Sequence, residues 1–578
     1  MPTIEDSAAQ PDAGMRPAVV APVPLAQAFS DLPAGLPTVE PVPGYDAAAA
    51  HVRVTGVAID SRMIRAGDLY IALPGSGRHG ASFTAAALRS GAVAVLTDEA
   101  GVEAAAAAAE LVGTVPLFRA ARLRELVGPL SATIFNSQPA ETSRPALFGV
   151  TGTNGKTTTT YFINALLAGL GRTTGLMGTI EIHAGGQPIA SALTTPESPQ
   201  VHGILGLMRE RGIETAAMEV SSHAIEYRRV DSVHFDVAGF TNLTQDHLDL
   251  HGTMEEYFAV KAELFGRERT SRAVIIIDDP WGLKMAEVAG ADVVTLSTSV
   301  AQDDDAQTNG GNTNGGQTND GHTNGGGTPP RTSDWQVRNV VKHGLGHRFS
   351  LHGPAGEELT LHSGLPGTFN ISNAALATVM VLASGVAADD VQRAADSADP
   401  FSAAVPGRMQ LIGDHPAAIV DFAHNPDALA RTLESVRPPD PEAKLIVVFG
   451  ATGQRDQTKR PLMGATAAQL ADVVIVTDDD PHDEDEAVIR QGVLEGALRA
   501  RDAAERPCEV LEIYPRAEAI DRAVAMATAA DTVLIAGRGH EVWQEVKGVN
   551  LPLDDRVELA RALTRYGFSV HPSHRIES

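Results

Sequence analysis

Cysteine is almost absent from this chain, since Cys508 is the single one among 578 residues. A lone cysteine excludes an intrachain disulfide and is typical of a reducing compartment. No apolar run is long enough to cross a bilayer. The opening residues, MPTIEDSAAQ, are acidic and precede no compact apolar segment, so they lack the pattern of a secretory signal. These absences predict a cytoplasmic protein without membrane insertion.

Basic residues are outnumbered, because 45 Lys and Arg stand against 72 Asp and Glu and give a net charge of -27. This excess of acid argues against a nucleic-acid partner, so an anionic substrate has to be met by local basic groups. The length of 578 residues exceeds what one hydrophobic core supports. It predicts roughly three or four domains.

Composition and the order of predicted elements divide the chain into four regions. Residues 1–45 are rich in Ala and Pro, and we expect them to form a disordered extension. Residues 46–143 predict a small α/β domain. Residues 144–405 and 406–578 each alternate strands and helices, which is the pattern of a mostly parallel sheet. In these two regions we predict strands at 147–150, 215–220, 236–241, 273–277, 418–421, 444–449, 472–476 and 532–536.

A degenerate repeat, TNGGN-TNGGQ-TNDGH-TNGGG, interrupts the third of these regions. It is polar and glycine-rich, so it has nothing to bury. We therefore expect residues 303–328 to form a flexible low-complexity insertion at the surface.

The segment GVTGTNGKTTTT, from Gly149 to Thr160, follows an apolar strand and leads into a helix. Backbone N–H groups of such a turn, together with a helix N-terminus, bind anions. Lys156 would reach the β- and γ-phosphates of a nucleotide, and the Thr157 hydroxyl would hold Mg²⁺. The strict phosphate-loop motif has Gly where this chain has Val150, so the turn is a shortened variant. A hairpin turn that merely contains Lys-Thr is disfavoured by the strand before it and the helix after it.

Polar residues follow the later strands, at the edge where open α/β sheets bind ligands. Glu219 lies one residue before the end of one strand, in MEVSSH, and His247 follows the next strand, in TNLTQDHLDLHG. Lys261 lies on an amphipathic helix. Taken singly, Glu219 could cap a turn, His247 could be a structural histidine, and Lys261 could be a solvated helix residue. Their order after a phosphate loop instead favours one site, with Glu219 as a Mg²⁺ carboxylate.

The motifs TGTNGKTTT, MEVSSH, TNLTQDHLDLHG, VKAELF, LPGTFNISNAALA, VPGR, DFAHNPDAL, FGATGQRDQTKRPLMG and AGRGHE occur in the order of the Mur ligases. The chain resembles most the MurE type, which adds the third amino acid of the peptidoglycan stem. The resemblance implies a UDP-sugar-binding domain at 46–143, a central P-loop ATPase domain at 144–405 and a C-terminal Rossmann-like domain at 406–578. It also implies a monomer that takes part in cell wall biogenesis.

The resemblance further implies a reaction. ATP phosphorylates the D-Glu γ-carboxylate of UDP-MurNAc-L-Ala-D-Glu, and the amine of an amino acid attacks the acyl phosphate and expels phosphate. A phosphoryl group in transfer needs cations and Mg²⁺ more than it needs a base. The positions that match the catalytic and metal-binding residues are Lys156, Thr157, Glu219, His247 and Lys261, the last of which is carbamylated in the family.

The same match implies the remaining contacts. The ATP-binding positions are Gly152, Thr153, Asn154, Gly155, Lys156, Thr157, Thr158, Asn370, Arg408 and His424. The UDP-MurNAc-dipeptide positions are Ser61, Thr194, Thr195, Ser221, Tyr227 and Arg229, with Tyr227 where the family often has Gln. The amino-acid positions are Arg455, Asp479, Asp480, Pro481, His482, Gly537 and Glu541, of which Arg455 would meet the α-carboxylate.

Amino-acid selectivity is where the chain departs from the family. Enzymes of this type that add meso-diaminopimelate carry Asp-Asn-Pro-Arg, and the arginine pairs with the distal carboxylate. Here the matching residues are Asp479, Asp480, Pro481 and His482. A neutral imidazole cannot replace a bidentate guanidinium, and Asp480 adds negative charge. We therefore predict a basic diamino acid, namely lysine, ornithine or diaminobutyrate, with meso-diaminopimelate as the alternative.

Other functions fit these residues less well. A related ligase would add another stem residue or extend a folate with glutamate. A P-loop kinase or NTP-driven switch would lack the residues around Lys261 and the third domain, and a nucleotide-binding scaffold would have no use for Lys261 beside His247. The Asp-Ser-Arg turn at 60–62, MEVSSH and residues 479–482 favour the MurE type.

Overall fold

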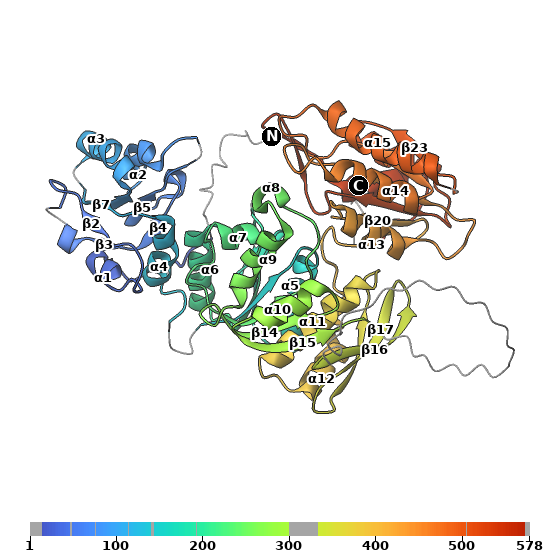
Figure 1. The fold of residues 1–578 in the computed structure, drawn as a ribbon, viewed down its shortest axis with the longest axis horizontal. Coiled ribbons are helices and arrows are strands. Elements are labelled where there is room, and N and C mark those ends of the chain that lie inside the picture. Colours follow the sequence, from blue (N-terminus) through green and yellow to red (C-terminus); the bar gives the residue numbers. More distant parts are fainter. Residues whose placement is uncertain are drawn as a thin grey trace, which may run out of the picture.

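The computed structural model describes residues 14–46, 49–75, 77–113, 115–139, 144–191, 193–299, 333–504 and 506–572. Three large sheets follow one another along the chain, and each is flanked by helices (Figure 1). We call the parts built on them the N-terminal, central and C-terminal domains. The predicted insertion at 303–328 lies outside the described residues. Among the helices that are described, none is long and apolar enough to span a membrane.

The N-terminal domain (blue in Figure 1) holds a five-stranded sheet in the order β2-β7-β6-β5-β4. Apolar side chains on its two faces form separate clusters under the surrounding helices. The strands are β2 (Glu40–Pro41), β4 (Gly56–Ala58), β5 (Asp68–Ala72), β6 (Ala94–Thr97) and β7 (Leu117–Arg119); the helices are α1 (Leu25–Ser30), α2 (Thr84–Arg89), α3 (Val102–Val112) and α4 (Arg124–Phe135).

The prediction of disorder over residues 1–45 is wrong for residues 14–45. β1 (Val23–Pro24) pairs with β3 (Arg53–Val54), and β2 pairs with β7. Leu25 of α1 is fully buried. The Ala- and Pro-rich composition hides these short elements because packing against the domain, not local propensity, stabilises them. Residues 1–13 lie outside the described part of the chain.

The central domain holds an eleven-stranded sheet in the order β11-β10-β9-β12-β8-β13-β14-β15-β16-β17-β18. Its strands from β9 to β16 are parallel, whereas the two edges are antiparallel. The predicted strands fall on β8, β12, β13 and β14. The bounds are β8 (Ala146–Thr151), β9 (Thr174–Met177), β10 (Glu181–His183), β11 (Ile189–Ala190), β12 (Thr215–Glu219), β13 (Phe235–Phe240), β14 (Thr270–Ile276), β15 (Asp292–Ser297), β16 (Trp335–His343), β17 (Gly346–His352) and β18 (Glu358–Ser363).

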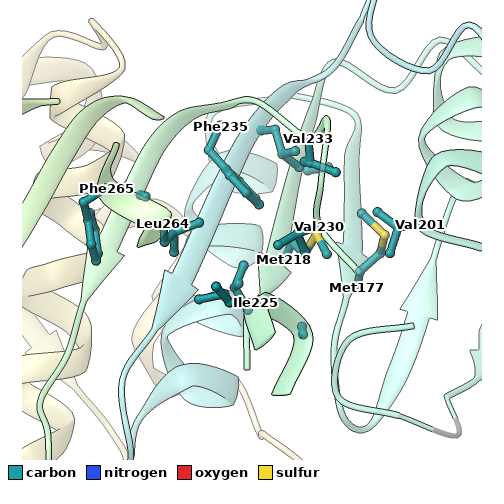
Figure 2. Packing of buried hydrophobic residues seen from close by; sticks show 14 of the residues in the cluster. Met177, Val201, Met218, Ile225, Val230, Val233, Phe235, Leu264 and Phe265 are labelled. Atoms are coloured by element: carbon teal, nitrogen blue, oxygen red, sulfur yellow. The ribbon is translucent and has the colours of Figure 1, made fainter. Parts of the chain in front are cut away.

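Helices cover both faces of this sheet, and each face has its own apolar cluster. In Figure 2, Met218 of β12 and Phe235 of β13 lie in the first cluster, together with Val201 of α6. This packing is what fixes the carboxyl ends of the parallel strands beside one another. On that face lie α6 (Ser198–Glu210), α7 (Ser222–Glu226), α9 (Met254–Ala262) and α10 (Pro280–Val288); on the other lie α5 (Lys156–Gly169), α11 (Phe369–Ala383) and α12 (Ala388–Ala398).

The C-terminal domain (orange to red in Figure 1) holds a six-stranded sheet in the order β19-β20-β24-β21-β22-β23, and a separate hairpin, β25–β26. The sheet is parallel apart from β19. The strands are β19 (Gln410–Gly413), β20 (Ala417–Asp421), β21 (Leu445–Phe449), β22 (Val473–Val476), β23 (Glu509–Glu512), β24 (Thr532–Ala536), β25 (Trp543–Val546) and β26 (Val549–Pro552); the helices are α13 (Pro426–Val436), α14 (Lys459–Leu470), α15 (Glu486–Ala503), α16 (Arg516–Met526) and α17 (Asp555–Arg565). The predicted α/β class with mostly parallel sheets is confirmed.

Residues 14–19 join the N-terminal domain to α6 of the central domain. The Arg16 guanidinium is buried and donates to the Asp68 carboxylate at 2.7 Å. The backbone amides of Ala18 and Val19 donate to the Glu210 carboxylate at 2.9 and 3.1 Å. Burial raises the pKa of Asp68, although Arg16 opposes this shift. The segment therefore connects the N-terminal domain, through the Arg16–Asp68 pair, to the central domain, through the hydrogen bonds to Glu210.

Replacing Arg16 with Ala should lower the free energy of opening of β5 by about 3 kcal/mol at pH 7, because the Asp68 carboxylate would stay buried without its cation. Hydrogen exchange of the β5 amides, followed by mass spectrometry, measures this quantity. The control is Arg172→Ala, which removes an exposed pair with Glu214 and should cost the neighbouring β12 less than about 0.5 kcal/mol. Unchanged exchange of β5 in Arg16→Ala would contradict the assignment.

Candidate active site

The phosphate loop connects β8 to α5 at the switch point of the central sheet. Gly152 and Gly155 have φ of +144° and +90°, in the region that favours glycine. A side chain at Gly152 would collide with the Thr241 hydroxyl at the end of β13. That hydroxyl donates to the Asn154 carbonyl at 2.7 Å and holds the loop against the sheet. Val150 needs no glycine because it still lies within β8.

Lys156, Thr157 and Glu219 meet at this loop, as expected. The Lys156 ammonium donates back to the carbonyls of Gly152 and Thr153 at 3.0 and 2.9 Å. The Thr157 hydroxyl donates to Glu219 Oε2 at 2.8 Å. Burial lowers the pKa of Lys156, and the Glu219 carboxylate opposes this shift. The helix start therefore carries a cation and a hydroxyl beside a fully buried carboxylate.

Lys261 is buried, which excludes the alternative of a solvated helix residue. Its side chain is 1% exposed, and its ammonium donates to the Gly152 carbonyl at 3.0 Å. It lies 4.6 Å from the centre of the Tyr257 ring. Burial lowers the pKa of Lys261 well below its usual value, and the nearby Lys156 lowers it further. Burial therefore favours the neutral amine, which is the nucleophilic form of this side chain.

His247 precedes α8 (Leu248–His251) and belongs to a group of packed rings. Its ring centre lies 4.8 Å from that of His223 and 6.3 Å from that of Tyr257, on which His251 stacks at 4.9 Å. Burial lowers the pKa of His247 to about 3, although Asp246 opposes this shift. The ring is therefore neutral near pH 7, with a lone pair available to a ligand. Tyr257, His223 and His251 were not predicted.

The C-terminal domain contacts the phosphate loop through the loop before α13. The Asn154 side chain contacts Asn425 at 3.3 Å and Asp427 at 3.2 Å. The His424 ring lies 3.6 Å from the Asp246 carboxylate. Burial would raise the pKa of Asp246, but the hydrogen bond and the charge of His424 outweigh burial and lower it. Asn425 and Asp427 were missed, although they adjoin His424 in DFAHNPDAL.

Arg408 connects the phosphate loop with the C-terminal domain. One nitrogen of its guanidinium donates to the Thr157 hydroxyl at 3.4 Å, and another lies 3.5 Å from His540 Nδ1. The guanidinium also stacks 4.2 Å from the centre of the Phe422 ring. These contacts place one fixed positive charge over the start of α5, where phosphate groups are expected to bind.

Asn370 is buried at the start of α11, behind the phosphate loop. Its amide nitrogen donates to the Pro366 carbonyl at 2.7 Å, and its oxygen accepts from Asn373 at 2.9 Å. Asn373, which was not predicted, in turn accepts from the Thr159 hydroxyl at 3.4 Å. Asn370 is thus linked to α5 through its neighbour. Its predicted place beside a nucleotide base stays a prediction.

Most of the positions predicted for the UDP-sugar dipeptide form one group at the end of β12. The Thr195 hydroxyl donates to the Glu219 carbonyl at 2.8 Å and accepts from the Ser221 amide at 3.2 Å. Arg229 donates to the Thr195 carbonyl at 3.3 Å and lies over the Tyr227 ring at 5.7 Å.

The two remaining dipeptide positions are Thr194 and Ser61. The Thr194 hydroxyl lies 3.1 Å from the Thr179 hydroxyl, which donates its proton to Glu219. Ser61 lies in a short helical turn of the N-terminal domain, at 61–63. No hydrogen bond within the described part of the chain joins Ser61 to the others. Its predicted contact with the substrate stays a prediction.

Three carboxylates and one arginine gather in the C-terminal domain. Oxygens of Asp479, Asp480 and Glu541 lie within 4.8 Å of one another. The fully buried Arg538 bonds to Asp480 and lies 3.8 Å from the carboxylates of both Asp479 and Glu541. Burial and the neighbouring Asp479 carboxylate raise the pKa of Glu541 to about 8. The group therefore has more acids than cations and suits an ammonium ligand. Arg538 was not predicted, although AGRGHE contains it.

The other predicted amino-acid positions divide between this group and solvent. A side chain at Gly537 would approach Asp479 within 2.7 Å, and Gly453 packs against the Pro481 carbonyl. His482 Nδ1 lies 2.8 Å from the carboxylate of Glu545 on β25. Arg455 is exposed, and among the described residues no hydrogen bond of its side chain is present. The structure does not bring Arg455 to the acidic group.

Family models match all three domains. A model described as Mur ligase family, catalytic domain, matches residues 53–127; the Mur ligase middle domain matches residues 150–381; and the Mur ligase, glutamate ligase domain, matches residues 407–539. The matched ranges contain the phosphate loop, Lys261 and two members of the acidic group, Asp479 and Asp480, whereas Glu541 lies just beyond the last range.

Known proteins match over nearly the whole chain. The UDP-N-acetylmuramoyl-L-alanyl-D-glutamate--2,6-diaminopimelate ligase of Streptomyces avermitilis is 38% identical over 550 residues, which cover 95% of this chain and 98% of the relative. The UDP-N-acetylmuramyl-tripeptide synthetase of Leifsonia xyli is 39% identical over 519 residues, or 89% and 93% of the two chains. A solved 2,6-diaminopimelate ligase superposes with a TM-score of 0.58 at 28% identity, covering 91% of this chain and 97% of that one. The chain therefore belongs to the Mur ligase family, as an ATP-dependent acid–amino acid ligase of the MurE type.

Proposed function

We propose that this ligase joins a diamino acid to the D-Glu γ-carboxylate of UDP-MurNAc-L-Ala-D-Glu, through an acyl phosphate. One observation carries the proposal: Arg408 contacts both Thr157 of the phosphate loop and His540, which precedes Glu541 in the acidic group. Phosphoryl transfer and amine attack occur at one carboxylate, so their binding sites have to be adjacent. Lys156 and Arg408 would neutralise the transferred phosphoryl group. The acidic group would hold an ammonium of the incoming amino acid.

The group around Glu219 suits Mg²⁺. Glu219 is fully buried and accepts from the hydroxyls of Thr157 and Thr179 and from the Thr179 amide. Carboxylate and hydroxyl oxygens are the ligands that Mg²⁺ prefers. When bound, Mg²⁺ would offset the charge of the nucleotide phosphates. We propose Thr157, Glu219, His247 and a carbamylated Lys261 as the residues that hold it.

Carbamylation of Lys261 follows from its environment. The neutral amine attacks the carbon of CO₂, a N–C bond forms, one C=O electron pair moves to oxygen, and the amine proton leaves to water. The product is an anionic carbamate with oxygen donors. It would replace the repulsion between Lys261 and Lys156 with attraction.

The identity of the amino acid has two candidates. The names of the Streptomyces avermitilis relative and of the solved structure support 2,6-diaminopimelate, and the comparisons favour this alternative. The Leifsonia xyli relative is named without an amino acid. The charges around residues 479–482 instead favour a basic diamino acid, because Asp480 and Glu545, joined by Glu541 once it is ionised, would repel a distal carboxylate.

Phosphate release from ATP should require both UDP-MurNAc-L-Ala-D-Glu and a diamino acid. Initial rates measured with lysine, ornithine, diaminobutyrate and meso-diaminopimelate distinguish the two candidates. Faster turnover with meso-diaminopimelate than with the other three would exclude the basic diamino acid. Phosphate release that does not depend on any amino acid would exclude the ligase reaction.

Lys261→Ala should lower kcat by about a hundredfold or more, because an anionic ligand and its charge would be missing from the site. Added acetate, a short carboxylate able to enter the vacated space, should restore part of the rate. Lys284→Ala is the control, since Lys284 stacks on Phe258 and Trp281 outside the site and its loss should leave kcat unchanged. Full activity of Lys261→Ala without acetate would show that Lys261 has no such role.

The KM for the diamino acid should fall as the pH rises from 7 through 8. The reason is that Glu541 has a pKa raised to about 8, so the free protein holds it protonated at lower pH and ionised above it. Only the ionised form attracts an ammonium. In Glu541→Gln the KM should be higher and lack this pH dependence. An equal fall of KM in the variant would mean that the titration belongs to another group.

A further inference from the structure

We propose that Glu545 determines which amino acid is accepted, and that it acts through His482. The proposal rests on the ligase function above and on the charges of the amino-acid site. The family resemblance matches His482 to the arginine of Asp-Asn-Pro-Arg in ligases that add meso-diaminopimelate. The His482 ring has a partner at this position, because its Nδ1 lies 2.8 Å from Glu545 Oε2.

The backbone fixes Glu545 against His482. The His482 amide donates to the Glu545 carbonyl at 3.2 Å, and the Lys547 amide donates to the His482 carbonyl at 2.8 Å. The Glu545 amide donates to the Asp480 carboxylate at 3.2 Å. These hydrogen bonds hold the loop at 479–482 and strand β25 in register. The side chains of His482 and Glu545 therefore face each other.

This pairing decides what the imidazole offers a ligand. A carboxylate can only accept, so the proton of the neutral ring lies on Nδ1 and points to Glu545. Nε2 is then an acceptor, which suits the N–H groups of an ammonium and repels the lone pairs of a carboxylate. Glu545 therefore sets the polarity of His482 in favour of a basic distal group.

The surrounding charges act in the same direction. Arg538 is the cation bonded to Asp480, and it is shared with Asp479 and Glu541. Glu545 adds a further acid that is 40% exposed and faces the ring of His482. A distal carboxylate would meet this excess of negative charge, whereas a distal ammonium would be attracted by it.

A consequence is that arginine in place of His482 is not sufficient to accept a distal carboxylate. Glu545 would form an ion pair with the new guanidinium, because Arg and carboxylate fit each other in bidentate geometry. Recognition of a carboxylate substrate then requires the loss of Glu545 as well. The two substitutions should be strongly non-additive.

The test measures kcat/KM for L-lysine and for meso-diaminopimelate in wild type, His482→Arg, Glu545→Gln and the double variant. Wild type should prefer lysine. Each single change should shift the ratio toward meso-diaminopimelate by about tenfold or less, and the double change by about a thousandfold, well beyond the product of the single shifts. A purely structural role would lower both values together and leave their ratio unchanged.

Glu512→Gln is the matched control. Glu512 is a carboxylate of the same domain with the same 40% exposure, and it pairs with Arg490 rather than with side chains of the 479–482 loop. The ratio of kcat/KM for the two amino acids in Glu512→Gln should therefore match that of wild type. A ratio unchanged in Glu545→Gln, additive shifts in the double variant, or a wild-type preference for meso-diaminopimelate would each overturn the inference while leaving the ligase reaction intact. Absence of amino-acid-dependent phosphate release in wild type would overturn the proposed function itself.

Discussion

Two lysine side chains meet at one carbonyl oxygen, that of Gly152, to which Lys156 and Lys261 each donate at 3.0 Å. Two positive charges this close and this deeply buried would repel, and Lys156 accordingly lowers the pKa of Lys261. Acids have to compensate, and Asp246 acts on both lysines. The C-terminal domain reaches the same acid through His424. The concentration of positive charge at one loop thus explains why residues from two domains converge there, and why a polyphosphate would match it.

The parallel core of the fold could be predicted because its strands are almost continuous apolar runs buried on both faces. LFGV at 147–150 and IVVF at 446–449 are of this kind. The exposed strands could not be predicted, since β16 and β26 have mostly exposed side chains and lack a clear apolar pattern. The prediction of disorder over the first 45 residues failed for the opposite reason. Their composition is typical of disorder, yet Arg16 and Leu25 are buried.

The candidate site divides in the same way. Lys156 and Thr157 adjoin each other in a motif whose chemistry is local, so sequence alone places them. The burial of Lys261 depends on contact with a loop more than a hundred residues away, which only the family resemblance anticipated. Glu545 had no signal at all, because WQEV in β25 has the composition of an exposed hairpin. Its partner His482 becomes informative only when the loop at 479–482 is seen in register with β25.

The pairing of β15 with β16 has a consequence for the evolution of the chain. Leu296 pairs with Trp335, so the polypeptide leaves the sheet and returns to it one strand away. The entropy of closing such a gap grows only with the logarithm of the connection's length, by about 0.6 kcal/mol for each doubling. The strand pairing fixes only the two ends of this connection, so evolutionary change in the number of residues between them alters the closure entropy only slightly.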